Sequence, residues 1–134
     1  MLKLDPITLS VVRGILETTQ REMTLALEKT SRSSVLNLAR DYSTTIFNSN
    51  PEMILQGQDI PIHLGSFMPA MKAVADFFGE DIHEGDLILH NDPAYQGSHI
   101  VDMCMYRPVF YKEKHVFWTA CKGHLTDAGG PVPA

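Results

Sequence analysis

The chain has little of what marks secreted, membrane-spanning or nucleic-acid-binding proteins. Only two of its 134 residues are cysteine, fewer than the disulfide framework of a small secreted domain requires. Eleven basic residues against sixteen acidic ones give a net charge of −5, and no Lys/Arg run offers a surface for nucleic acid or anionic lipid. No apolar stretch approaches the roughly 18 residues of a transmembrane helix, and the first residues lack a signal-peptide core. We expect a cytoplasmic protein that binds neither membranes nor nucleic acid.

Two further classes of site have no support in the sequence. Cys104 and Cys121 fall on neighbouring predicted strands, but in a cytosolic protein we expect two buried thiols and no disulfide. A glycine-rich phosphate-binding loop of the G-x-x-x-x-G-K-[ST] type is also missing, so we expect nucleotide to bind elsewhere.

Residues 90–131 contain side chains of the types that bind metal ions. His99 and His124 are each followed three residues later by an aspartate, Asp102 and Asp127, in segments rich in turn formers. Two imidazoles and a carboxylate suit Zn, Mn or Fe(II) better than Ca or Mg, and a second carboxylate favours Zn or Mn. In the alternative interpretation, the histidines bond to backbone groups and the aspartates form Asx turns. The spacing alone leaves both open.

A predicted hairpin brings the two pairs together. Residues 106–110 and 115–122 are rich in aromatic and β-branched types, and residues 112–114 between them suit a turn.

Pairing of Phe110 with His115 would place Val101 opposite His124, with Asp102 as its diagonal neighbour. Such partners have Cβ atoms about 5 to 8 Å apart, within reach of one ion. Pro108 cannot donate to a ladder, so an edge position or a bulge would shift this register by one residue.

The rest of the chain predicts a mixed fold. Asp5 can cap a helix that begins at Pro6 and runs to about Thr30, with an apolar stripe for core packing or subunit contact. The stripe consists of Leu9, Val12, Leu16, Thr19, Met23 and Leu27.

Residues 42–47 and 53–56 read as strands around a turn, residues 67–78 as a second helix ended by Gly79, and residues 87–89 as a buried strand. The hairpins favour an α+β fold over a doubly wound parallel sheet.

Other polar residues have simpler interpretations. His63, between an Ile-Pro-Ile run and Leu64-Gly65, either anchors a turn or serves a site, and the sequence leaves both open. Asn91 and Asp92 before Pro93 are typical of a turn start, although a role beside a substrate stays open. Surface or structural roles are expected for His83, Glu84, His90 and His115.

Linked short motifs run along the whole chain. They are Asp5-Pro6-Ile7-Thr8, Arg21-Glu22-Met23, Arg40-Asp41-Tyr42-Ser43, Ile60-Pro61-Ile62-His63-Leu64-Gly65-Ser66, Asn91-Asp92-Pro93, Gly97-Ser98-His99-Ile100-Val101-Asp102, Arg107-Pro108-Val109-Phe110 and Gly123-His124-Leu125-Thr126-Asp127-Ala128-Gly129-Gly130. In order and spacing these motifs resemble those of the hydantoinase B/oxoprolinase family. Two positions depart from the family pattern: Gln96-Gly97-Ser98 stands where Gly-Gly-Thr is usual, and Pro133-Ala134 where Pro-Gly is common.

The resemblance implies a ligand set for a divalent metal, Zn or Mn. His99, Asp102 and His124 would bind the ion with Asp41 as fourth ligand, and Asp127 would orient a ligand or its loop. His63 and Asp127 become the candidates for a catalytic role.

The resemblance also implies an enzyme. Family members act with ATP on lactams, hydantoins, 5-oxoproline or ketones, and a hydantoinase A-like subunit would bind ATP and Mg in a hetero-oligomer with paired subunits. The metal would polarise the substrate carbonyl or activate water. We expect first a cyclic amide hydrolase, second an acetone or acetophenone carboxylase, and third a non-catalytic metal scaffold with ligands closed to solvent.

Family members are several hundred residues long, so residues 1–134 are expected to be the N-terminal metal-binding part of such a subunit. The Gly-Gly-Pro-Val-Pro-Ala ending, inside a presumed site loop, led us to expect further sequence after it.

Overall fold

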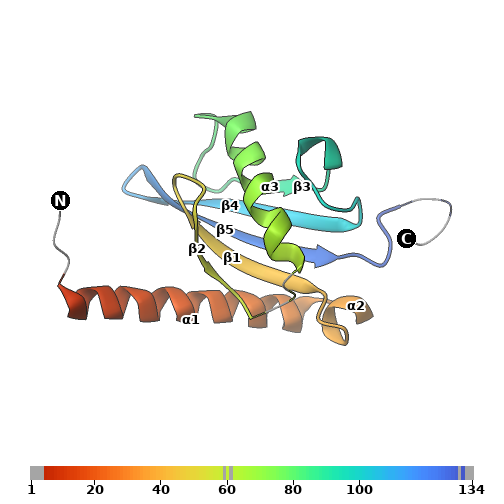
Figure 1. Cartoon of the computed structure of the whole chain (residues 1–134), viewed down its shortest axis with the longest axis horizontal. Helices are drawn as coiled ribbons and strands as arrows, with labels where there is room; N and C mark the ends of the chain where they lie inside the picture. The colour runs from red at the N-terminus through yellow and green to blue at the C-terminus, as the bar shows by residue number, and fades with distance from the viewer. Residues whose placement is uncertain (1–4, 59, 61, 130, 132–134) are drawn as a thin grey trace.

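Five antiparallel strands form one sheet with helices on both faces (Figure 1). The computed structural model describes residues 5–58, 60, 62–129 and 131. The strands lie in the order β2-β1-β5-β4-β3, which confirms the α+β expectation. The elements are α1 (Pro6–Thr30), α2 (Ser34–Asn37), β1 (Tyr42–Asn48), β2 (Met53–Gln56), α3 (Ile62–Phe78), β3 (Ile88–His90), the 3-10 helix η1 (Pro93–Tyr95), β4 (Asp102–Tyr111) and β5 (Lys114–His124).

Helix α1 has the predicted bounds but not the predicted packing. The Asp5 carboxylate accepts hydrogen bonds from the backbone N–H groups of Ile7 and Thr8, which caps the helix. The apolar stripe, however, is largely open in the first half, where Leu9 is 56% exposed. Figure 1 shows these N-terminal turns lying beyond β1 and β2. The stripe was predicted to serve core packing or subunit contact; its first half does not pack in the core of this chain, and subunit contact there stays a prediction.

The buried contact of α1 is polar. Gln20 donates from its side-chain amide to the hydroxyls of Thr24, at 2.9 Å, and Thr44 on β1, at 2.8 Å. A buried amide is favourable only when it is hydrogen-bonded, so this pair fixes where the helix lies on the sheet.

Helix α3 covers the opposite face and carries the core. It begins at Ile62, five residues before the predicted start, although Gly65 and Pro69 are poor helix formers. Packing explains this early start, because Phe67 contacts the rings of Phe47 and Tyr106 edge-on. Gly79, with φ of +54°, ends the helix as predicted. The buried core consists of Phe47, Phe67, Ala70, Met71, Val74, Cys104, Tyr106, Trp118 and Ala120.

The β4–β5 hairpin corrects the predicted register by one residue. Phe110 does pair with His115, but Val109 pairs with Phe117, so the ladder contains a bulge. Asp102 therefore lies directly opposite His124, not diagonal to it. A bulge of this kind was foreseen beside Pro108. Its consequence is that Asp102 and His124 share one face of the sheet.

The remaining differences lie at the edges. The strand predicted at residues 87–89 is present as β3, but at the sheet edge and not buried as expected: Leu87 just before it is 55% exposed and Leu89 within it 59%. Helix α2 was not predicted. Cys104 and Cys121 are free thiols; Cys104 is buried as expected, whereas Cys121 is half-buried. Across the residues that the structure describes, no helix combines the length and apolarity needed to cross a bilayer.

Candidate metal centre

Seven polar residues line a hollow of about 420 Å³ at one end of the sheet. The start of β4 and the end of β5 form one wall, and the first turns of α3 and the segment before β1 form the other. The lining residues are Asp41, His63, Ser66, Ser98, His99, Asp102 and His124. Every residue of the predicted ligand set is among them.

His99, Asp102 and His124 form the centre of this group. Each offers one ligand atom, and the three atoms all lie within 4.8 Å of one another. Asp102 is 6% exposed, while the His99 side chain is exposed. The His124 Nδ1 lies 2.8 Å from Asp102 Oδ1, and because a carboxylate only accepts, the ring donates this bond. The imidazole then presents Nε2 for another partner.

Asp102 is held as an ionised carboxylate. Burial opposes its ionisation, but the hydrogen bonds from Ser98 and His124 and the nearby Lys122 charge outweigh burial, so its pKa lies below the ordinary value. A carboxylate in this form is ready to bind a cation.

Asp41 joins the hollow from the other wall. A left-handed residue, Arg40, with φ of 54°, turns the chain between α2 and β1. The Asp41 carbonyl then accepts a 3.0 Å hydrogen bond from the backbone N–H of His124, which fixes the two residues side by side. Its carboxylate oxygen Oδ1 lies 3.3 Å from His63 Nε2.

His63 lies in the hollow and not at a surface turn, with 4% of its surface exposed. Its Nδ1 lies 3.1 Å from the Ser43 hydroxyl. Burial and the Lys122 charge lower the pKa of His63 and outweigh the opposing charges of Asp102 and Asp41. The Asp41 carboxylate only accepts, so a neutral ring carries its proton on Nε2 and donates to Asp41. The single proton of the Ser43 hydroxyl then has two acceptors within reach, His63 Nδ1 and the Ile60 carbonyl at 3.2 Å.

Three members of the site were missed from the sequence. Lys122 is 1% exposed, and its ammonium donates to the hydroxyls of Ser66 and Ser98, both in the hollow. Lys122 lies two residues before His124 on the same face of β5, and a lysine at an inward position of a strand was the available signal.

Other predicted site residues lie outside the hollow. Asp127 is exposed, and its Oδ1 accepts from the backbone N–H of Gly129 at 2.7 Å. Asp92 caps η1 by accepting from Ala94 N–H, and Asn91 donates to the Ile100 carbonyl, as expected of a turn start. Gly130 and residues 132–134, the end of the predicted site loop, fall outside the described residues.

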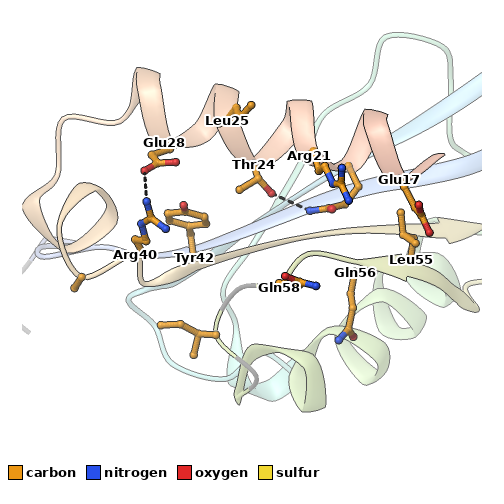
Figure 2. Close-up of a pocket in the computed structure, with 13 residues that line it drawn as sticks. Glu17, Arg21, Thr24, Leu25, Glu28, Arg40, Tyr42, Leu55, Gln56 and Gln58 are labelled. Atoms are coloured by element: carbon orange, nitrogen blue, oxygen red, sulfur yellow. Dashed lines mark hydrogen bonds and ion pairs between the residues drawn. The ribbon is translucent and has the colours of Figure 1, made fainter. Parts of the chain in front are cut away.

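A larger hollow of about 740 Å³ lies elsewhere, between α1 and the β1–β2 edge (Figure 2). Its charges are of both signs, and the Arg40 guanidinium pairs with Glu28 at 3.1 Å. Figure 2 shows the Glu28 and Arg40 side chains pointing toward each other. Among the described residues, metal-ligand atoms come together in the smaller hollow and not in this one, so we place the candidate chemistry in the smaller hollow.

The donor set fits a borderline divalent cation. Two imidazoles with one buried carboxylate, and a second carboxylate nearby, match Zn or Mn better than the all-oxygen shells of Ca or Mg. The side open to solvent at His99 leaves room for a further ligand.

Comparisons with known proteins agree along the whole chain. The model of the family described as hydantoinase B/oxoprolinase matches residues 5–134. The chain is 75% identical over 134 residues to caprolactamase subunit beta of Pseudomonas jessenii, covering all of this chain and 23% of that protein. It is 34% identical to 5-oxoprolinase of Dictyostelium discoideum, covering 98% of this chain and 10% of that one.

Solved structures show the same fold. The crystal structure of the ATP-dependent caprolactamase from Pseudomonas jessenii superposes with a TM-score of 0.91, covering 99% of this chain and 23% of that one at 75% identity. A nucleotide-free acetone carboxylase structure superposes with a TM-score of 0.85 at 20% sequence identity, covering 97% of this chain and 17% of that one. At this identity the likeness shows the fold alone. The chain thus spans under a quarter of the length of these relatives. On the match over residues 5–134, the chain belongs to the hydantoinase B/oxoprolinase family.

Proposed function

We propose that this chain is the metal-binding part of a subunit of an ATP-dependent lactam hydrolase. The observation that carries the proposal is the meeting of His99, Asp102 and His124 within 4.8 Å, in a chain 75% identical to a caprolactamase beta subunit. In this proposal residues 1–134 are one functional unit of a larger protein.

The ligands would be His99, Asp102, His124 and Asp41. Asp102 and His124 face each other across one ladder, so little rearrangement is needed for both to reach one ion. His63 would hold Asp41 in place through Nε2. Asp127 would order the loop after β5 through its bond to Gly129.

A divalent ion in this hollow would supply Lewis-acid polarisation of an amide carbonyl or acidify a water molecule. The residues themselves provide a buried, ionised Asp102, a neutral His63 and an open side at His99 for the substrate. A closed structural ion site has weaker support, because structural sites enclose their ligands and His99 is exposed.

ATP and Mg would bind to a partner subunit resembling hydantoinase A, in a hetero-oligomer with paired subunits. The relative's designation as a subunit beta supports a partner chain. Ketone carboxylation has less support, because the likeness to acetone carboxylase is 20% in sequence. Cytoplasmic localisation stays a prediction.

Two measurements on the natural-length protein with its partner test this function. Coupled ATP consumption with caprolactam as substrate is expected, and consumption only with acetone and bicarbonate would overturn the hydrolase assignment. Metal analysis should find a divalent ion that His99→Ala and His124→Ala lose, whereas the exposed His83→Ala retains it. Equal metal content in all four proteins would overturn the metal site.

A further inference from the structure

Lys122 is a buried ammonium beneath the candidate metal centre. Its Nζ lies 2.8 Å from the Ser98 hydroxyl and 2.5 Å from the Ser66 hydroxyl, and 5.5 Å from the centre of the Phe67 ring. A buried charge is costly unless hydrogen-bonded. Among the described residues, Lys122 meets that condition through Ser66 and Ser98, which both line the hollow.

The chemistry of an ammonium fixes the direction of these hydrogen bonds. It has three protons and no lone pair, so both serine oxygens must accept from it. Each hydroxyl proton is then available to another acceptor. Ser98 donates to Asp102 Oδ2 at 2.6 Å, and Ser66 donates to the His63 carbonyl at 2.9 Å.

The result is a fixed carboxylate. Asp102 Oδ2 is held by Ser98, and Oδ1 faces His124 at 2.8 Å, so the carboxylate has one defined orientation. The segment before β4 that carries Ser98 also carries His99, and Ser66 lies on the first turns of α3. One ammonium thus joins both walls of the hollow.

We propose that Lys122 is a positioning residue, which acts through Ser98 to orient the Asp102 carboxylate toward the ion. This inference rests on the proposed metal site. In this role Lys122 supports the ligand set without binding the ion or the substrate itself.

Loss of the Lys122 charge and loss of its positioning role should change the affinity for the ion in opposite directions. The positive charge of Lys122 repels a divalent cation, so removing it without loss of order would tighten ion binding. Loss of a positioning partner instead weakens binding, by about 10 to 100-fold for groups that orient metal ligands. The sign of the change in affinity therefore separates the two.

The test uses the natural-length protein and zinc titration after removal of bound ions. Lys122→Met keeps the apolar stem and is expected to weaken zinc binding about 10 to 100-fold. Ser98→Ala should weaken zinc binding by a similar factor. Because both substitutions break the same chain of hydrogen bonds, the double variant should bind zinc no more weakly than the weaker-binding of the two single variants. Ser10→Ala, on the exposed face of α1 and outside the hollow, is the control for the same chemical change and should keep the native affinity. Unchanged or tighter binding by Lys122→Met, additive losses, or an equal loss in Ser10→Ala would overturn the inference.

An ion-free crystal structure of Lys122→Met provides a second measurement that does not depend on the metal. The Asp102 carboxylate should turn away from Ser98 and His124, and an unmoved carboxylate would overturn the inference. If the native protein binds no ion, the proposed function fails while this structure still decides the role of Lys122. If Lys122→Met does not fold, Lys122→Gln, which is also uncharged and whose shorter side chain ends before the position of Nζ, is measured in its place with the same outcomes.

Discussion

Asp102 and Asp127 are chemically identical side chains in opposite surroundings. Asp102 is 6% exposed and receives hydrogen bonds from Ser98 and His124, whereas Asp127 is exposed and closes a turn with Gly129. A group that orients a loop changes an ion site indirectly, while a ligand defines it.

Exchange of each carboxylate for the isosteric amide should separate these roles. Asp102→Asn removes a charge from the ligand set and is expected to lose the ion outright, whereas Asp127→Asn should keep it with at most a 10 to 100-fold loss of affinity, roughly the range for supporting groups. Metal titration of both variants is the measurement. Loss of the ion in Asp127→Asn alone would mean that ligand and supporting group had been exchanged.

His63 should make stability depend on pH in the ion-free protein. Its folded pKa lies below the ordinary 6.5, so the unfolded chain binds more protons between those two values. The free energy of unfolding is then highest above pH 6.5 and falls as the pH drops toward the folded pKa.

We expect His63→Gln to be less stable at pH 7 but to show a flatter decline below it, measured by urea unfolding with a chelator present. Burial also lowers the pKa of His115, so this ring adds to the pH dependence of stability in the same range. The His115→Gln variant measures that contribution. An identical slope in His63→Gln and the native protein would show that this ring titrates normally.

At the scale of elements, the turn between η1 and β4 sets the position of Ser98 and His99. Gly97 N–H donates to the Asp92 carbonyl at 2.9 Å, and a Cβ added at Gly97 would lie 2.7 Å from that same oxygen. Backbone atoms cannot move aside as a flexible side chain can, so this turn requires glycine.

Gly97→Ala should therefore destabilise the protein by about 1 to 3 kcal/mol and weaken ion binding, because the displaced turn carries a ligand. Gly14→Ala is the matched control, since nothing lies within 4 Å of its added Cβ on exposed α1. There the same change should stabilise by roughly 0.5 to 1 kcal/mol through helix propensity. Thermal unfolding compares the two, and equal effects would contradict the close contact.

The sequence predicted those features well that depend on residues adjacent in the chain. The Asp5 cap, the end of α3 at Gly79 and the β4–β5 hairpin follow from adjacent residues. The bulge that places Asp102 opposite His124, and the early start of α3, depend on packing between distant segments. The metal ligands were found from spacing and family resemblance, whereas Lys122 was missed because its partners, Ser66 and Ser98, lie 56 and 24 residues away.

At the scale of the whole molecule, the candidate centre joins segments far apart in the chain. Asp41 precedes β1, His99 precedes β4, and Asp102 and His124 lie at the ends of β4 and β5. The hairpin contact is built into the sheet, and Asp41 reaches the hollow at the end of the β1–β5 ladder, where its carbonyl accepts from His124 N–H and its own N–H donates to Val35. An ion bound by all four would therefore stabilise the native state, because an unfolded chain does not hold them together.

Removal of the ion should lower global stability by an amount set by mass action. With free zinc at 100 times its dissociation constant, the native protein is expected to gain about 2.7 kcal/mol over the chelated form. Asp102→Asn should show no such difference, because it lacks the buried, charged ligand of the set. Urea unfolding of both proteins, with zinc and with chelator, measures the gain. A native protein equally stable in both conditions would mean that the four side chains do not act on one ion. A gain that persists in Asp102→Asn would place the ion elsewhere on the molecule.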